Sequence, residues 1–423
     1  MKRYRKVLLF IFASVFALLP LASCNKAIGN KTVFARGGFD GGIAEAAYAY
    51  DVKRGDSALP EEEEIAGGNV SEVTQPRAGQ ITAGAQDDNR YYSQWTGLFA
   101  PDGKFEVYLS DTWGMYSQRR VTVTVRNGEA PVAGASVVAT GEDGVSFRAV
   151  TNANGVAYLF PTAETGTISV TSGTHGNTAT FEAEHREVSV NLEGAEEKAD
   201  VIELMFVVDV TGSMGDEIRY LQAELRDVIA QVAAANANAT VNLAFLFYRD
   251  TDDSVPFTYV DFKDVTNEKN LNAHQKILAK QSADGGGDYP EAVDEALAMA
   301  ISKQWSANAT KLIFLVLDAP AHDGQENKTR FAKAVSDAAE KGIRICPVLA
   351  SGADLLCEYT TRSAALLTGG TFVFITDDSG IGGEHYDPDL PNLTVEYLNA
   401  CLVRLINGYH TGTFADPVSW RDQ

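Results

Sequence analysis

The chain has 423 residues, and its 57 acidic and 35 basic side chains give a formal net charge of −22 at pH 7. This charge excludes nucleic acid as a partner, because the phosphate backbone requires a basic protein face. The length allows two or three domains, each with its own core.

The first 24 residues have the pattern of an export signal. Four basic residues within the first six are followed by an apolar run from Val7 to Leu19 and by Leu21-Ala22-Ser23-Cys24. This ending resembles a bacterial lipobox, which implies that Cys24 carries acyl chains. We therefore expect an exported protein, lipid-anchored to a membrane of the bacterial cell envelope, with exposure at the cell surface as one arrangement. The alternative is an uncleaved membrane helix, for which this apolar run is short.

Residues 25–96 mix glycine, alanine and charged residues with only short apolar stretches, and they include the acidic run Glu61 to Glu64. Such a composition buries too little apolar area to fold alone. We therefore predict a flexible or loosely ordered tether that spaces the folded domains from the lipid surface. Its last part, residues 78–95, is richer in aromatic residues and is a candidate for packing on a neighbouring domain.

Residues 97–196 show short runs in which apolar and polar residues alternate, as in Val121–Val125 and Val188–Leu192. Alternation with a period of two indicates half-buried strands, and about seven of them predict an all-β sandwich. Residues 131–161 resemble the carboxypeptidase regulatory-like and Cna-B-like modules of exported bacterial proteins. This resemblance implies a stalk or spacer.

Residues 197–412 alternate apolar strands with helical stretches, which predicts an α/β domain with a doubly wound, mostly parallel sheet. The second and third strands are joined by a short acidic turn, so the third should be antiparallel. A C-terminal tail, residues 413–423, follows. The predicted strands are Val201–Val208, Val241–Tyr248, Val255–Phe262, Leu312–Leu317, Ile343–Leu349 and Thr371–Ile375. The predicted helices are Gly215–Ala235, Glu268–Lys280, Tyr289–Ile301, Glu326–Glu340, Leu355–Leu366 and Val395–Ile406.

Three polar segments should meet at the carboxyl edge of this sheet, where open α/β sheets bind ligands. They are Asp209-Val-Thr-Gly-Ser213 after the first strand, Asp288 at the end of a glycine-rich loop, and Asp318 after the fourth strand. Carboxylate and hydroxyl oxygens are hard ligands that suit Mg²⁺ or Mn²⁺. The candidate metal ligands are therefore Asp209, Thr211, Ser213, Asp288 and Asp318.

This set resembles the metal-ion-dependent adhesion site of von Willebrand factor A domains, in which D-x-S-x-S, a later Thr and a later Asp hold the ion. The resemblance implies that Asp288 stands in the place of the Thr, and its charge would partly neutralise the ion. It also implies a Rossmann-like fold for residues 197–412. A bound Mg²⁺ or Mn²⁺, with Ca²⁺ as an alternative ion, would engage an acidic side chain of a protein partner.

Each local signal also has a plainer interpretation. The segment from Asp209 to Ser213 would serve equally well as a helix N-cap, and the glycine run as a hinge. His322 is interpreted as structural or exposed. We expect the turn residues Asp250, Asp252 and Asp253 to be solvated, with a second calcium site as the alternative.

The cysteines are too few and too scattered for a disulfide framework or a zinc site. Beyond Cys24, we expect Cys346, Cys357 and Cys401 to be small buried apolar residues. A bridge between Cys357 and Cys401 is the alternative.

The function predicted is a cell-envelope-anchored binding or adhesion protein, and not an enzyme. The sequence has no G-x-S-x-G elbow, H-E-x-x-H pair or Walker loop. Phosphatases with a nucleophilic Asp generally have a second carboxylate two residues later, where this chain has Thr211. One alternative is a structural envelope or surface-fibre subunit whose metal only stabilises the fold. Less favoured are a metal-dependent hydrolase or phosphotransferase using Asp209, and a helper of an ATP-driven assembly machine.

Overall fold

The computed structural model describes residues 75–391 and 393–423. The described residues belong to one compact unit. The export signal, Cys24 and residues 25–74 of the predicted tether lie outside the described residues, so the structure leaves these predictions untested.

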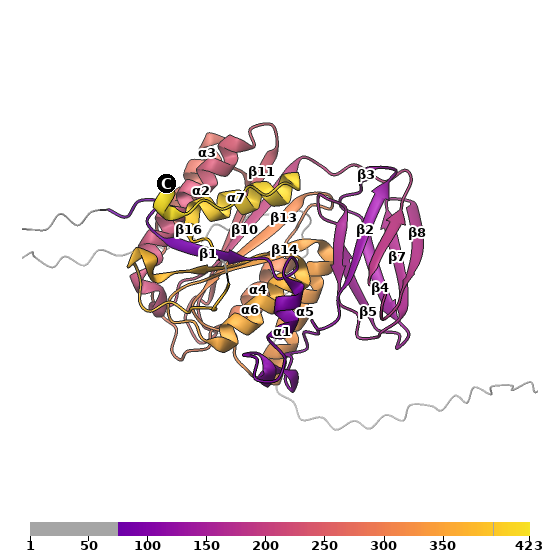
Figure 1. Ribbon diagram of the computed structural model, residues 1–423. Coiled ribbons are helices and arrows are strands. Elements are labelled where there is room, and N and C mark those ends of the chain that lie inside the picture. The colour runs from indigo at the N-terminus through magenta and orange to yellow at the C-terminus, as the bar shows by residue number, and fades with distance from the viewer. Residues whose placement is uncertain (1–74, 392) are drawn as a thin grey trace, which may run out of the picture. The chain divides into compact units, whose positions relative to one another are not determined.

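An eight-stranded sheet forms the larger part of the structure (Figure 1), in the order β12-β11-β10-β13-β14-β15-β1-β16. Strands β10, β11, β13, β14 and β15 are parallel, whereas β12 pairs antiparallel with β11 as predicted. The mostly parallel α/β sheet predicted from the sequence is thus confirmed. The strands are β10 (Val201–Asp209), β11 (Thr240–Tyr248), β12 (Phe257–Asp264), β13 (Thr310–Leu317), β14 (Ile343–Leu349), β15 (Phe372–Ile375), β1 (Thr82–Gln86) and β16 (Glu396–Tyr397).

Helices cover both faces of this sheet. Neighbouring residues of a strand point to opposite faces, so each central strand contributes to two separate cores. In β10, Met205 and Val207 join the core under α4, α5 and α6, whereas Leu204 and Phe206 join the core under α2, α3 and α7. The central strands are consequently apolar on both sides. The helices are α2 (Ile218–Ala235), α3 (Glu268–Leu278), α4 (Val293–Ser302), α5 (Gln325–Lys341), α6 (Leu355–Thr368) and α7 (Leu398–Thr411).

Two four-stranded sheets, which form a sandwich, lie between β1 and β10 along the chain. One sheet has the order β3-β2-β6 with β9 paired to β2, and the other has the order β5-β4-β7-β8. Inward-facing residues such as Val123, Val137 and Ile168 form its core. The strands are β2 (Val121–Asn127), β3 (Ala130–Pro131), β4 (Ser136–Gly141), β5 (Ser146–Val150), β6 (Val156–Leu159), β7 (Gly166–Ser172), β8 (His175–Phe181) and β9 (Glu187–Asn191).

The structure corrects the predicted boundary at residue 96. Strand β1 lies inside the large sheet, antiparallel to β15 and β16, and the first sandwich strand begins only at residue 121. Between them, α1 (Tyr92–Gly97) and the segment after it add Trp95, Phe105 and Trp113 to the core of the α/β domain. Trp95, from the stretch interpreted as a tether, and Phe105 and Trp113, from the stretch interpreted as sandwich, therefore complete this domain.

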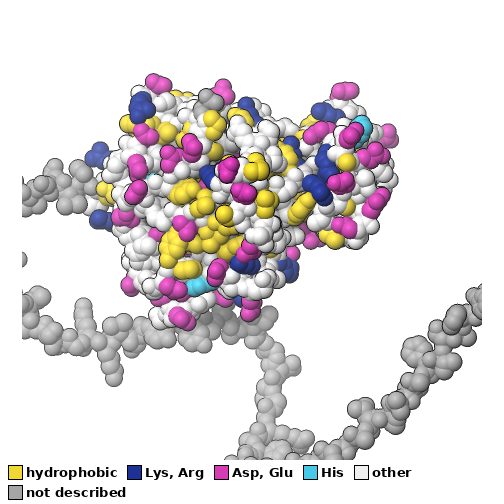
Figure 2. All heavy atoms as spheres, turned by 60° about the horizontal axis from the view of Figure 1, so that its bottom comes forward, with side chains coloured by type: hydrophobic (Ala, Val, Ile, Leu, Met, Phe, Trp, Pro, Cys, Tyr) yellow, Lys and Arg dark blue, Asp and Glu magenta, His cyan; other side chains and the backbone are white. Residues whose placement is uncertain are grey.

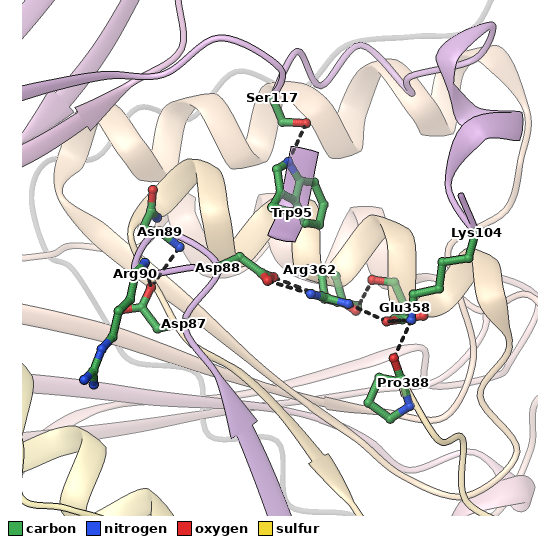
Figure 3. Close-up of polar contacts among 11 residues, drawn as sticks. Asp87, Asp88, Asn89, Arg90, Trp95, Lys104, Ser117, Glu358, Arg362 and Pro388 are labelled. Atoms are coloured by element: carbon green, nitrogen blue, oxygen red, sulfur yellow. Dashed lines mark hydrogen bonds and ion pairs between the residues drawn. The ribbon is translucent and has the colours of Figure 1, made fainter. Parts of the chain in front are cut away.

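A buried ion network fixes this segment to α6 (Figure 3). The Arg362 guanidinium donates to Asp88 at 2.5 and 2.9 Å and to Glu358 at 2.7 Å. Lys104 donates to Glu358 at 2.7 Å and to the carbonyl oxygen of Pro388 at 2.6 Å. The Arg362, Asp88 and Glu358 side chains are at most 2% exposed. Each buried charge therefore has a partner of opposite charge, and without that partner its burial would destabilise the fold.

Cys346, Cys357 and Cys401 are buried and unbridged, as the sequence suggested. The alternative bridge between Cys357 and Cys401 is not formed. Within residues 75–391 and 393–423, every helix is too short or too polar to span a bilayer.

Candidate metal centre

Two buried carboxylates end neighbouring parallel strands at the carboxyl edge of the sheet. Asp209 is the last residue of β10, and Asp318 directly follows β13, which pairs with β10. Asp209 is fully buried and Asp318 is 3% exposed. The strand register therefore brings two predicted ligands to one place, as expected at this edge.

The turn after β10 adds two hydroxyl groups. Thr211 donates to Asp209 Oδ1 from its backbone N–H at 2.8 Å and from its hydroxyl at 2.6 Å. The Thr211 and Ser213 hydroxyl oxygens lie 3.0 Å apart. Thr211 is the N-cap residue of the 3₁₀ helix Gly212–Asp216, but neither this helix nor α2 has a side-chain cap hydrogen bond, so these side chains do not serve as caps.

The acidic side chains raise one another's pKa. Burial, and then the charge of Asp318, raises the pKa of Asp209 to about 7. Burial raises the pKa of Asp318 to about 6, with the charges of Glu217 and Asp216 adding to it, although a hydrogen bond with Ser213 opposes the shift. Charged carboxylates are thus disfavoured here unless a cation lies between them.

A third carboxylate, which the sequence interpretation did not assign, belongs to Glu291. It is 3% exposed, and its backbone N–H donates to the carbonyl oxygen of Pro320, two residues after Asp318. The pKa of Glu291 is raised to about 9, mainly by burial and then by the charges of Asp209, Asp250 and further acids. The motif G-G-G-D-x-P-E contained this residue, but two acids in one motif gave no reason to prefer the second.

Glycine is required where this loop meets the turn after β10. The Gly285 carbonyl oxygen accepts from the Gly212 N–H at 3.1 Å, and Gly286 has a φ of +73°. A Cβ on Gly286 would lie 2.8 Å from Glu291 Oε1 and 3.2 Å from Thr211 Cβ. The glycine run therefore does more than provide a hinge, because it lets the loop approach Thr211 closely.

Asp288, the remaining predicted ligand, follows the glycine run of this loop. Its side chain is exposed, and within the described residues no hydrogen bond joins it to Asp209, Thr211, Ser213 or Asp318. Its charge acts instead on His322: although burial lowers the pKa of this imidazole, Asp250 and then Asp288 raise it above its usual value.

Asp250 and Asp253, in the acidic turn after β11, are less exposed to solvent than predicted. Asp250 is 6% exposed and pairs with His322 Nε2 at 2.9 Å. Asp253 Oδ2 accepts from the Gly286 N–H at 2.9 Å, whereas Asp252 is exposed as expected. The turn therefore supports the glycine loop beside the carboxylates.

The donor set fits a hard divalent cation. Asp209 Oδ2, Asp318 Oδ1 and Glu291 Oε2 are buried and have no hydrogen-bond partner among the described residues. Buried, unpaired carboxylate oxygens of this kind are costly, and Mg²⁺ or Mn²⁺ is suited to oxygen ligands. In the part of the chain that the structure describes, no group of three or more His, Cys, Asp and Glu side chains has the arrangement of a metal site. A cation here would thus depend on the hydroxyl groups as well.

Residues 203–366 match the family model of the von Willebrand factor A domain. The chain contains a von Willebrand factor A domain. The five predicted ligands, Asp209, Thr211, Ser213, Asp288 and Asp318, lie within the matched range. Such domains often bind a divalent metal, and the donor set described above agrees with that property.

Two curated proteins are similar to this chain over short stretches. An alpha-protein kinase, vwkA, of Dictyostelium discoideum is 28% identical over 127 residues, which are 29% of this chain and 19% of the kinase. A protein of Acanthamoeba polyphaga mimivirus, named as an ariadne-like RING finger protein, is 28% identical over 156 residues, 36% of this chain and 15% of that protein. The chain thus spans about a fifth or less of the length of these relatives.

The solved structures that match this chain include two proteins of Bacteroides species. BatB from Bacteroides thetaiotaomicron, a conserved hypothetical protein, has 14% identity and a TM-score of 0.31, covering 41% of this chain and 89% of that one. An aerotolerance-related membrane protein from Bacteroides fragilis has 12% identity and a TM-score of 0.32, covering 50% of this chain and 100% of that one.

Proposed function

We propose that this protein is a binding protein whose von Willebrand factor A domain holds a divalent cation and engages a protein partner through it. Asp209, Thr211, Ser213 and Asp318 would hold Mg²⁺ or Mn²⁺. The observation that carries the proposal is the presence of two buried carboxylates with unpartnered oxygens at the ends of neighbouring strands.

The bound cation would supply positive charge and a coordination position for a carboxylate of the partner. The chain's own residues prepare that position. Thr211 fixes one oxygen of Asp209 by two hydrogen bonds, which leaves Oδ2 free. Glu291 adds negative charge beside them, and so favours a cation but reduces its attraction for an acidic partner.

Two observations favour binding over hydrolysis or phosphoryl transfer. Asp209 is fully buried, so its carboxylate is not accessible to a substrate as a nucleophile. The residue two positions later is Thr211, whose hydroxyl donates to Asp209 and supplies no second carboxylate. A binding role therefore requires fewer additional groups than an enzymatic one.

The proposal extends to the cell envelope, with the protein lipid-anchored at Cys24 and the sandwich acting as a spacer. On the face drawn in Figure 2, acidic side chains are spread over the visible surface and basic side chains form no continuous area. This distribution supports a partner other than nucleic acid. Cys24→Ala should release the protein from membranes or leave it unprocessed, as measured by fractionation and mass. Normal processing with membrane retention would contradict the anchor.

The function is tested by capturing partners from the native cell surface with Mg²⁺, with chelator, and with Mg²⁺ restored. We expect capture only with Mg²⁺, and its loss in Asp318→Ala. Asp323→Ala is the matched control, because Asp323 is an exposed acid five residues further along. Partners retained in chelator and in Asp318→Ala would contradict the proposal. Metal binding without any metal-dependent partner would favour the structural-subunit alternative.

A further inference from the structure

A small basic cavity lies at the opposite, amino edge of the sheet. Its lining includes Lys198, which precedes β10, and Lys311 and Arg344, the second residues of β13 and β14. The sandwich contributes Asn152 from the turn between β5 and β6. In the described part of the chain, no Asp or Glu lines this cavity. Three cationic groups in one enclosed space stand out in a chain with a net charge of −22.

The two lysines bind only backbone oxygens. Lys198 Nζ donates to the His410 carbonyl oxygen at 3.1 Å, near the end of α7. Lys311 Nζ donates to the carbonyl oxygens of Ala307 at 3.2 Å and Lys341 at 2.5 Å, the latter at the end of α5. Helix carboxyl ends carry only partial negative charge. These contacts explain where the ammonium groups lie, but leave much of their charge uncompensated.

Arg344 lacks even such contacts. It is 9% exposed, and among the described residues its guanidinium makes no hydrogen bond or ion pair. Its guanidinium lies over the ring of Tyr409, with 5.6 Å between Cζ and the ring centroid. A largely buried guanidinium without a protein acceptor is unfavourable, because its N–H donors lose part of their water without replacement.

The acids whose charges act on the two lysines, Asp200 and Glu203, are engaged elsewhere. Glu203 accepts from the backbone and hydroxyl of Ser306 at 2.8 and 2.5 Å, and Asp200 accepts from His410 at 2.9 Å. Burial is the largest effect on the three cations: it lowers the pKa of Lys198 and of Lys311 to about 8, and that of Arg344 below its usual range. Protein groups therefore do not neutralise this site.

We infer that this cavity binds a small monovalent inorganic anion of about the size of chloride, paired with the Arg344 guanidinium. The cavity volume is about 20 Å³, which suits a single particle not much larger than water and excludes phosphate esters and organic acids. The anion would lie between Arg344 and the two lysines. It would also hold the turn that carries Asn152 against the amino edge of the sheet.

The test is the thermal unfolding of the full chain in chloride, bromide or gluconate at equal ionic strength and pH 7. Gluconate is too large for the cavity. We expect the midpoint to rise in chloride and bromide relative to gluconate, by about 2 °C at an anion concentration ten times the Kd. Arg344→Met should abolish this difference, and in gluconate it should be at least as stable as the wild type, because it removes an unpaired buried charge.

The matched control is Arg148→Met. Arg148 lies on β5 and faces Glu340 at 3.7 Å, but its side chain is 50% exposed. This variant should keep the full anion effect. In crystals grown with bromide, anomalous scattering should locate the ion beside Arg344.

Equal midpoints in all three salts, or an anion effect that persists in Arg344→Met, would overturn the inference. So would a water molecule in place of bromide. A loss of stability in Arg344→Met in gluconate would show a purely structural role for the guanidinium, which also overturns it. These readouts are independent of divalent cations, so they are separate from tests of the proposed function.

Discussion

Asp209 ends β10 and Asp318 directly follows β13, its parallel partner strand, and after burial the charge of Asp318 is the largest cause that raises the pKa of Asp209, to about 7. This relationship connects the fold to the proposed function. A carboxylate whose pKa is raised on folding destabilises the folded state once it ionises. A divalent cation between the two carboxylates would remove that penalty.

The first prediction concerns stability without metal. The pKa of Asp209 rises on folding from 3.8 to about 7, so wild-type stability should fall as the pH rises between these values. At pH 8.5 in chelator, Asp209→Asn should therefore be more stable than the wild type, by about 1–3 kcal/mol. Urea unfolding measures the difference, with Asp323→Asn as the neutral control. A wild type more stable than Asp209→Asn in chelator would contradict the account.

The second prediction separates two acids of one loop. Glu291 is buried beside Asp209, whereas Asp288 is exposed. Glu291→Gln should weaken Mg²⁺ binding at least about tenfold, which corresponds to ~1.4 kcal/mol. Asp288→Asn should have a smaller effect. The dissociation constants of both variants decide the matter, and the opposite ranking would restore the assignment made from the sequence.

The sequence predicted the elements whose pattern is local, but it did not predict an element that depends on pairing between distant residues. The apolar run from Val201 predicted β10 almost to the residue, and the acidic turn correctly made β12 antiparallel. Strand β1 was missed because it pairs with β15 nearly three hundred residues away, as in Ala83 with Ile375. Its sequence, TAGAQ, has neither alternation nor β-branched runs, so only tertiary pairing makes it a strand.

The same distinction applies to the candidate site, of which the sequence predicted the residues that follow strands but not those in the loop. Asp209 and Asp318 directly follow apolar strands, and parallel strands end at one edge. No comparable rule predicts where the side chains of the loop between Gly285 and Glu291 lie. The predicted helix from Tyr289 begins only at Val293, because Glu291 pairs as a bridge with Ala321 and directs its side chain to the site. This pairing depends on the segment after β13, which contains Ala321, and no pattern in the sequence around Glu291 indicates it.

The third prediction concerns the network that fixes residues 82–117 to α6. Removing the Asp88 carboxylate would leave Arg362 with an incompletely compensated buried charge. Asp88→Ala should therefore lower the free energy of unfolding by about 3–5 kcal/mol. Asp378→Ala is the matched control, since Asp378 pairs with Arg421 at 3.0 Å on the surface and should cost less than ~1 kcal/mol. Similar losses in both variants would refute the assigned role of the network.

The fourth prediction concerns pH. Burial lowers the pKa of His385, but hydrogen bonds to Glu217 at 2.8 Å and Asp377 at 2.7 Å outweigh it and raise the pKa above 6.5. A raised histidine pKa stabilises the fold below the unfolded value and loses this effect as the pH rises through the folded value. His385→Gln should therefore cost about 1–2 kcal/mol at pH 5.5 and clearly less at pH 8.5.

Denaturant unfolding of wild type and His385→Gln at the two pH values measures this difference. His410→Gln is the control, because the pKa of His410 is lowered, by burial first and then by Lys198. Its cost should not increase at low pH. A cost of His385→Gln that is independent of pH would show that the imidazole acts as a neutral hydrogen-bonding group.

The most direct test of the central claim is calorimetric titration of Mg²⁺ and Mn²⁺ into the wild type and into Asp318→Ala, with Asp323→Ala as the control. The account predicts saturable binding of one ion to the wild type and to the control, and no measurable binding to Asp318→Ala, with the fold of that variant retained. Equal metal affinity in all three proteins, or no binding to any of them, would contradict the claim that Asp209 and Asp318 form a divalent-cation site.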